Sequence, residues 1–105
     1  MFKVIGTITY LEKLDKLPKD YREAADKIPP KLADNPNLGD PLGYPFLRER
    51  RVREKRLYYL IYNDLQLVLL VAISGKKDQQ ATIDRIKEQL DEYRKVAEEV
   101  VKQVS

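Results

Sequence analysis

Basic side chains gather in one short stretch of this 105-residue chain. Residues 48–56, with the sequence RERRVREKR, hold six of the chain's 20 Lys and Arg residues together with two glutamates. A run of apolar residues and tyrosines, 57–62, follows directly. Cationic groups that a rigid sheet holds in place bind phosphates, and neighbouring tyrosines stack on bases. The stretch therefore predicts either a site for a phosphate-bearing ligand or, as charge runs usually are, a solvated outer strand.

The residue types that are absent narrow the chemistry. The sequence has no Cys and no His, which excludes thiol nucleophiles, disulfides, the usual zinc ligands and an imidazole base. Any reaction must therefore rely on Lys, Arg, Tyr, Asp, Glu, Ser or Thr, and we expect neither a metal nor a cofactor.

Length and composition indicate one globular domain, residues 1–105. Hydrophobic residues make up 43% of the chain, charged residues make up 35%, and the formal net charge is +3. A chain of this size buries roughly two thirds of its unfolded surface, which is enough for one core. No apolar run is long enough to span a bilayer, and residues 1–17 lack the pattern of a signal peptide. We therefore expect a cytoplasmic protein that does not enter a membrane.

The first part of the chain has the pattern of a strand followed by a pair of helices. Alternating residues predict a strand over 2–9, and leucines at helical spacing predict a short helix that Pro18 ends. A second helix is expected over 20–27. The adjacent prolines Pro29-Pro30 should interrupt it, because a proline disfavours helical geometry in the residue before it, and Pro30 can open a further helical turn.

The middle of the chain predicts a loop and three more strands. Residues 35–45 hold three of the six prolines and form the main loop. Strands are expected over 46–51, 55–62 and 65–74. Asn63-Asp64 predicts a two-residue hairpin turn, because both residues tolerate positive φ. The last strand is apolar on both faces and should be central and covered.

The C-terminal segment, 78–104, predicts one long helix that Asp78 caps. Its apolar residues follow a seven-residue repeat: Ile83, Ile86, Leu90, Tyr93, Ala97, Val100 and Val104. Such a helix is longer than a small sheet, so two arrangements stand equally: packing on the sheet, or contact of its distal half with a partner helix or a second copy in a homodimer. The predicted fold class is α+β, with an N-terminal strand and helical hairpin on a small, mainly antiparallel four-stranded sheet and a long C-terminal helix.

Four local motifs, taken in order, resemble the RelE/ParE superfamily of toxins from type II toxin–antitoxin systems. They are Leu14-x-x-Leu17-Pro18, Asn35-Pro36 with Gly39-Asp40-Pro41-Leu42, the hairpin Arg51 to Tyr59, and Ile73-Ser74-Gly75-Lys76-Lys77. The resemblance covers roughly residues 2–90. It implies a toxin that binds the ribosome and cleaves mRNA without a metal, and a cognate antitoxin with an acidic or amphipathic helical segment.

The resemblance also assigns residues. In members that cut mRNA, the 2′-hydroxyl attacks the adjacent phosphate while basic groups move protons and stabilise the charge on the phosphorane. By position, the catalytic residues would be Arg51, Arg56 and Lys77. Supporting contacts to RNA would come from Arg48, Arg50, Arg53, Lys55 and Lys76, with Tyr58 and Tyr62 as stacking residues. Tyr58 and Tyr62 share a strand face with Arg56.

Two positions depart from the family's pattern and keep other functions open. Glu49 stands where a basic residue is expected, and Ile83 stands where the catalytic tyrosine is expected. A carboxylate at 49 either acts as a base or disables the site, and Arg56 either binds phosphate or pairs with Glu49 or Glu54. The alternatives are therefore a ParE-like, non-nuclease toxin that inhibits a protein target, and a non-catalytic homologue that binds RNA or the ribosome.

Overall fold

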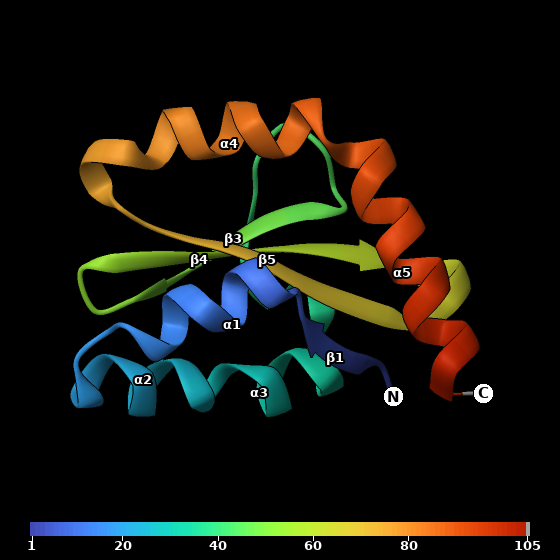
Figure 1. Cartoon of the computed structure of the whole chain (residues 1–105), viewed down its shortest axis with the longest axis horizontal. Helices are drawn as coiled ribbons and strands as arrows, with labels where there is room; N and C mark the ends of the chain where they lie inside the picture. The colour runs from blue at the N-terminus through green and yellow to red at the C-terminus, as the bar shows by residue number, and fades with distance from the viewer. Residues whose placement is uncertain (105) are drawn as a thin grey trace.

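Strand β5 (Leu67–Gly75) lies at the centre of the sheet, as its apolar sequence predicts. The computed structural model describes residues 1–104, without the side chain of Val104. β5 pairs in parallel with β1 (Lys3–Gly6) on one side and antiparallel with β4 (Lys55–Tyr62) on the other. Both of its faces are covered, so alternate residues enter two different cores (Figure 1).

The sheet has five strands, in the order β1-β5-β4-β3-β2. β3 (Leu47–Val52) pairs antiparallel with β4. The fifth strand, β2 (Asp40–Pro41), lies inside the segment that the sequence predicts as a loop and pairs with β3. The α+β fold class is therefore confirmed, with one strand more than predicted. Two residues that include a proline are too few to show the alternating pattern of a strand. β2 is recognised only from its pairing with β3 in the folded structure.

Three helices cover one face of the sheet (Figure 1). They are α1 (Ile8–Asp15), α2 (Lys19–Asp26) and α3 (Ile28–Asp34), and the short turn η1 (Pro36–Leu38) follows them. The predicted interruption at Pro29-Pro30 is confirmed: α2 ends before it, and the prolines lie in the first turn of α3, where a missing N–H costs nothing. The first strand is shorter than predicted, because the side chain of Thr7 accepts the N–H of Tyr10 and starts α1 at Ile8.

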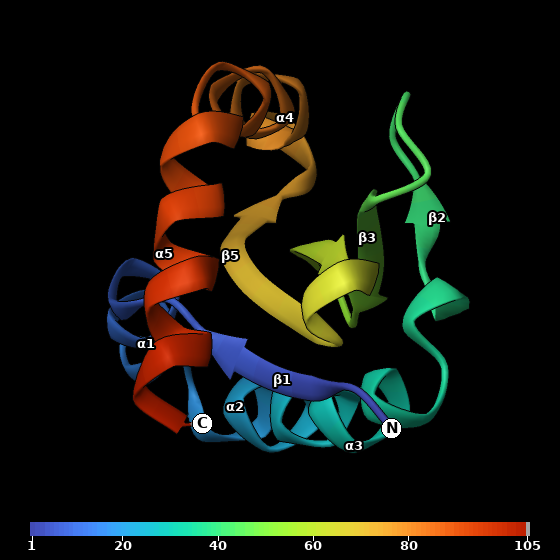
Figure 2. The ribbon, with the colours of Figure 1, turned by 90° about the vertical axis from the view of Figure 1, so that its right-hand side faces the viewer.

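The C-terminal segment covers the other face, and it consists of two helices (Figures 1 and 2). After β5 and the turn η3 (Lys76–Asp78) come α4 (Gln79–Glu88) and α5 (Leu90–Val104). The backbone leaves helical geometry at Gln89, with φ −109° and ψ 18°. The bend lets α5 turn down along the end of the sheet instead of extending past it. Neither proline nor glycine marks the bend, so the uninterrupted repeat concealed it.

The apolar repeat of this segment packs on its own sheet. Ile83, Ile86 and Ala97 are buried, and Leu90 and Tyr93 pack against the same core as Leu69 and Val71 of β5. Val100 is half-buried. Of the two arrangements that the sequence allowed, the structure contains the intramolecular one.

Two local predictions are wrong. The chain between β4 and β5 forms the turn η2 (Asn63–Leu65), and the positive φ, 51°, falls on Gln66 and not on Asn63 or Asp64. Asp78 stands at the start of α4, but its side chain makes no capping hydrogen bond; its carbonyl accepts the hydroxyl of Thr82 instead, over 2.8 Å. Across residues 1–104, every helix is too short or too polar to cross a bilayer.

Candidate functional site

The strand register places the candidate catalytic groups on the face that α4 covers. Glu49 of β3 lies opposite Tyr58 of β4, and Arg51 lies opposite Arg56. Residues directly opposite each other in an antiparallel pair point to the same side of the sheet. One end of this face therefore carries two guanidinium groups and one carboxylate, beside the tip of the β3–β4 hairpin.

Glu49 is held from two directions. The Nε of Arg56 lies 3.6 Å from its Oε1, and the side chains of Glu49 and Arg56 are only 13% and 18% exposed, respectively. The Nε2 of Gln79, the first residue of α4, donates to both carboxylate oxygens, over 3.1 and 2.9 Å. Charge-assisted hydrogen bonds of this kind fix a side chain more firmly than neutral ones. Arg56 therefore pairs with Glu49 and not with Glu54, which accepts the hydroxyl of Tyr21.

Gln79 is the residue of this cluster that sequence reasoning missed. It comes 30 residues after Glu49 in the chain, and a glutamine near the start of a helix is too common to stand out. Only the packing of α4 across the sheet brings it to the carboxylate.

Tyr58 lies beneath the cluster and presents no ring face to solvent. Its side chain is fully buried, and its hydroxyl lies 2.7 Å from the Oγ of Ser74. Burial is the main cause that raises its pKa. A nucleotide base therefore cannot stack on the Tyr58 ring in this conformation. Tyr58 packs beneath the Glu49–Arg56 pair and supports it.

Tyr62 lies at the far end of β4, away from the cluster. The guanidinium of Arg94 on α5 covers its ring, 5.5 Å from the ring centroid. Burial raises the pKa of Tyr62 to about 12. Tyr62 thus belongs to the contact between α5 and the sheet.

The exposed basic groups of the site come from two segments at the same end of the sheet. Arg51 is exposed, and its Nε donates to the carbonyl of Arg53 over 3.0 Å. Lys76 and Lys77 are also exposed and follow β5 directly, close in sequence to Ser74, the strand partner of Arg56. Three solvent-facing cations therefore lie at the same end of the sheet as the Glu49–Arg56 pair.

The remaining basic residues of the hairpin have other surroundings. Arg48 and Arg50 alternate with Glu49 and belong to the opposite face of β3. Arg53 lies 4.0 Å from Asp20 of α2, and the ammonium of Lys55 lies over the ring of Tyr21, 5.8 Å from its centroid. The basic residues that form one run in the sequence are therefore divided between the two faces of the sheet.

Arg48 braces a loop. Its Nε donates to the carbonyl of Pro45 over 2.9 Å, and its Nη1 donates to the carbonyls of Gly39 over 2.8 Å and Asn37 over 3.4 Å. These bonds tie the guanidinium to the loop between β2 and β3, through Pro45, and to the segment just before β2, through Asn37 and Gly39.

Ile83, at the position where the resemblance places a tyrosine, is 7% exposed and packs in the core under α4. Nothing of the family's tyrosine chemistry is available from that position. Within residues 1–104, no group of three or more acidic side chains lies together in a way that would hold a metal ion.

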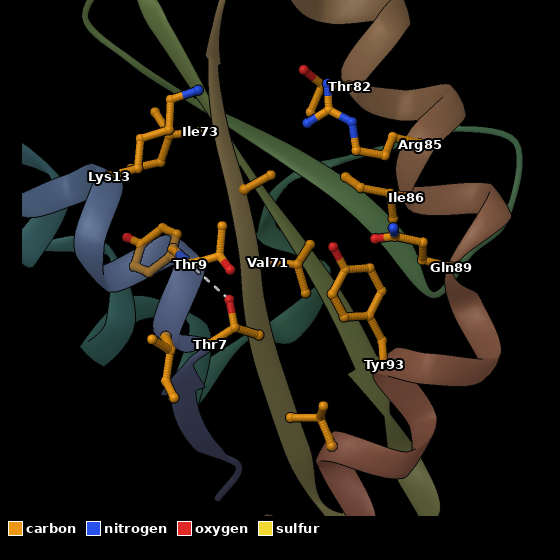
Figure 3. A pocket seen from close by; sticks show the side chains of 14 residues that line it. Thr7, Thr9, Lys13, Val71, Ile73, Thr82, Arg85, Ile86, Gln89 and Tyr93 are labelled. Atoms are coloured by element: carbon orange, nitrogen blue, oxygen red, sulfur yellow. Dashed lines mark hydrogen bonds between the residues drawn. The ribbon is translucent and has the colours of Figure 1, made fainter.

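A cavity of about 550 Å³ separates α1 from α4 and α5. β1 pairs with β5 only as far as Leu70, where the N–H of Thr7 makes the last bond, so Val71 and Ile73 of β5 border the cavity. Figure 3 shows Lys13 on one wall and Arg85 on the other. The exposed side chains of Ile8 and Val96 form part of the lining, which contains no acidic residue.

The chain matches no protein-family model and no curated protein, but its fold is similar to that of solved toxins. An E. coli RelE mutant in the free state is 16% identical, with a TM-score of 0.71, and the match covers 83% of this chain and 96% of that chain. A chain of the RelBE2 toxin–antitoxin complex of Mycobacterium tuberculosis is 24% identical, with a TM-score of 0.63, and the match covers 71% of this chain and 91% of that chain. The archaeal RelE–RelB complex of Pyrococcus horikoshii is 16% identical, with a TM-score of 0.62 and coverage of 71% and 94%. The chain therefore has the fold of the RelE toxins.

Proposed function

We propose that the chain is a toxin that inhibits translation by binding the ribosome and cleaving mRNA without a metal. The observation that carries the proposal is the Glu49–Arg56–Gln79 cluster on a RelE-like sheet, with exposed Arg51 and the Lys76–Lys77 pair at the same end of that sheet. Such a cluster supplies an acceptor for a proton and several cations for a phosphate within one small area.

The reaction is an attack of the 2′-hydroxyl on the neighbouring phosphorus. The Glu49 carboxylate takes the hydroxyl proton as the O2′–P bond forms, and the P–O5′ bond breaks. The guanidinium groups of Arg51 and Arg56 stabilise the negative charge that grows on the phosphorane oxygens. Lys77 donates a proton to the departing 5′-oxygen. The products are a 2′,3′-cyclic phosphate and a 5′-hydroxyl, so protons and bonds balance without a metal or a cofactor.

Primer extension in a cell-free translation reaction tests this function. Purified protein should produce new 5′ ends in the mRNA only when ribosomes are present, and Arg56→Ala should abolish them. Arg22→Ala is the matched control, because this arginine of α2 makes a surface contact with Asp15, at 3.9 Å, on the opposite face of the sheet. Intact mRNA with the unchanged protein would contradict the proposal.

A second candidate function is a non-catalytic one, either a ParE-like inhibitor of a protein target or an RNA- or ribosome-binding homologue. The specific observation in its favour is that a carboxylate already occupies Arg56 and that Ile83 is a core residue. In this case translation would stop with intact mRNA, or would continue normally, and Arg56→Ala would leave the effect unchanged.

We also propose that the cavity between α1 and α4–α5 receives a segment of a cognate antitoxin. The similar structures include toxins in complex with RelB antitoxins. Lys13 and Arg85 face the cavity from opposite walls, and exposed Ile8 and Val96 add apolar surface. This combination favours an amphipathic, acidic segment.

Rescue of growth tests the antitoxin surface. Cells that express the toxin and a library of fragments from the source genome should survive where a fragment encodes the antitoxin. The double variant Lys13→Glu with Arg85→Glu should stay toxic but escape that rescue, whereas Lys31→Glu, on the exposed side of α3, should be rescued normally. Equal rescue of all three forms would contradict this placement.

A further inference from the structure

An aromatic pair stands on the loop between β2 and β3. The rings of Tyr44 and Phe46 are stacked, with centroids 4.8 Å apart and planes 20° apart. Phe46 packs against both hydrophobic cores, while Tyr44 is 41% exposed. The ammonium of Lys87 on α4 lies 5.6 Å from the centroid of the Tyr44 ring. An exposed aromatic ring is thus stacked on a partly buried phenylalanine that packs against the cores, and it is accompanied by a cation.

The loop that presents Tyr44 is held in place by several bonds. Arg48 donates to the carbonyl of Pro45 in the loop and to that of Gly39 just before β2, so it ties the loop to that segment. The N–H of Leu47 donates to the carbonyl of Tyr44 over 3.2 Å. Gly43 has φ 93°, a left-handed conformation that residues with a Cβ rarely adopt, and an added Cβ would meet the Lys87 ammonium at 2.9 Å. The ring is therefore preorganised, which lowers the entropy cost of binding a flat ligand.

The loop lies on the same side of the sheet as the catalytic cluster. It leads directly into β3, where Glu49 follows Phe46 by three positions, and it arches up to α4 (Figures 1 and 2). Lys87 and Gln79 lie on one helix, about 12 Å apart along its axis at 1.5 Å per residue. Because Gln79 contacts Glu49 and Lys87 lies over Tyr44, the margin between β3 and α4 connects the cluster with the Tyr44 ring.

We propose that Tyr44, on its Phe46 support, is a stacking site for an unpaired base of single-stranded RNA, and that Lys87 moves from the ring to a neighbouring phosphate when the base arrives. The inference rests on the proposed function and names a contact with its substrate. Stacking is tolerant of base identity because every base has a π-face, so this contact sets the path of the strand and not the sequence that is cut.

The absence of Trp from the sequence makes a specific reporter available. Tyr44→Trp introduces the only tryptophan, and oligoadenylate RNA should quench its fluorescence in a saturable way as a base stacks on the indole. The matched control is Tyr21→Trp, because Tyr21 also lies beneath a lysine, 5.8 Å from Lys55, but on α2 at the other face. Its fluorescence should not respond to RNA.

Affinity gives the second readout. With labelled oligoadenylate, Tyr44→Leu should bind on the order of tenfold more weakly than the unchanged protein, while Tyr44→Phe should bind normally. Thermal unfolding of each variant confirms that the fold is retained. Unaltered affinity of Tyr44→Leu, or indole fluorescence of Tyr44→Trp that RNA leaves unchanged, would overturn the stacking site.

The translation assay separates this inference from the proposed function. Ribosome-dependent cleavage that Arg56→Ala abolishes, together with normal RNA binding by Tyr44→Leu, removes the stacking site and leaves the function standing. If the unchanged protein does not bind oligoadenylate, the stacking site is rejected, and the mapped mRNA ends still decide the function.

Discussion

Gln79 on α4 donates its side-chain amide to both carboxylate oxygens of Glu49 on β3, over 3.1 and 2.9 Å. This contact joins the C-terminal helical layer to the basic face of the sheet. Because Arg56 holds the same carboxylate from β4, the orientation of Glu49 depends on three separate elements. The geometry of the proposed site is thereby linked to the position of α4.

Gln79→Ala should lower the cleavage rate by on the order of tenfold to hundredfold with little change in KM, because Glu49 loses one of its two anchors and a misplaced base reacts slowly. Single-turnover cleavage of ribosome-bound mRNA measures the rate. Gln80→Ala is the control, since this neighbour donates its side-chain amide to Asp84 on the exposed side of α4. A loss of RNA binding that accounts for the whole effect would argue against a positioning role.

Glu49→Gln should reduce the cleavage rate by roughly a hundredfold to ten-thousandfold, the range for loss of a general base. The glutamine keeps the shape of the side chain but cannot accept the proton. RNA binding should be equal or tighter, because a negative charge leaves a phosphate site. Glu54→Gln, on the exposed tip of the same hairpin, should cleave normally. Faster cleavage by Glu49→Gln would mean that the carboxylate blocks the site instead of serving it.

Arg56→Ala should cost about 1–3 kcal/mol in the free energy of unfolding, besides abolishing cleavage, because it leaves the half-buried Glu49 without its cationic partner. Arg56→Lys should recover much of the stability but little of the activity, since an ammonium lacks the planar fork that binds a phosphate. Urea unfolding and primer extension measure the two effects. Equal stability of Arg56→Ala and the unchanged protein would show that water hydrates the Glu49 carboxylate well enough to replace its contact with Arg56.

The contact between Arg94 and Asp64 should make the anchoring of α5 depend on acidity. Arg94 donates to both oxygens of Asp64, over 3.0 and 2.6 Å, and these hydrogen bonds lower the pKa of Asp64 from its usual 3.8. A carboxyl group with a lowered folded-state pKa contributes stability that is full above its unfolded value and is lost as the pH falls through the folded value.

Asp64→Asn should therefore be less stable than the unchanged protein at neutral pH. The difference should begin to shrink as the pH falls below 3.8 and vanish once the pH has passed the lowered pKa of Asp64 in the folded protein. Chemical unfolding at a series of pH values gives the stability difference. Hydrogen exchange of the α5 amides should be faster in the variant at neutral pH. A difference that persists unchanged into acid would exclude the ion pair as its cause.

Local patterns in the sequence determined much of this molecule. The apolar run of β5 specified a strand covered on both faces. Successive residues point to opposite faces of the sheet, and because nearly all of them are apolar, each face needs a core. Pro29-Pro30 specified the break between α2 and α3, because proline lacks the N–H that an inner helical turn requires. The order of the motifs around the 51–59 hairpin was enough to predict a RelE-like fold. The fold of the chain is similar to that of solved RelE toxins.

The sites were decided by tertiary structure. Gln79 reaches Glu49 and Lys87 reaches Tyr44 because α4 packs across the sheet. Arg94 reaches Asp64 because the chain bends at Gln89 before α5 begins. Likewise, the alternation of β3 sends Arg48 to brace a loop and leaves Arg51 in solvent, although both belong to one basic run. Sequence patterns record the local preferences of a backbone and its faces. The partner that a charged side chain meets depends on distances between elements, which only the packed fold sets.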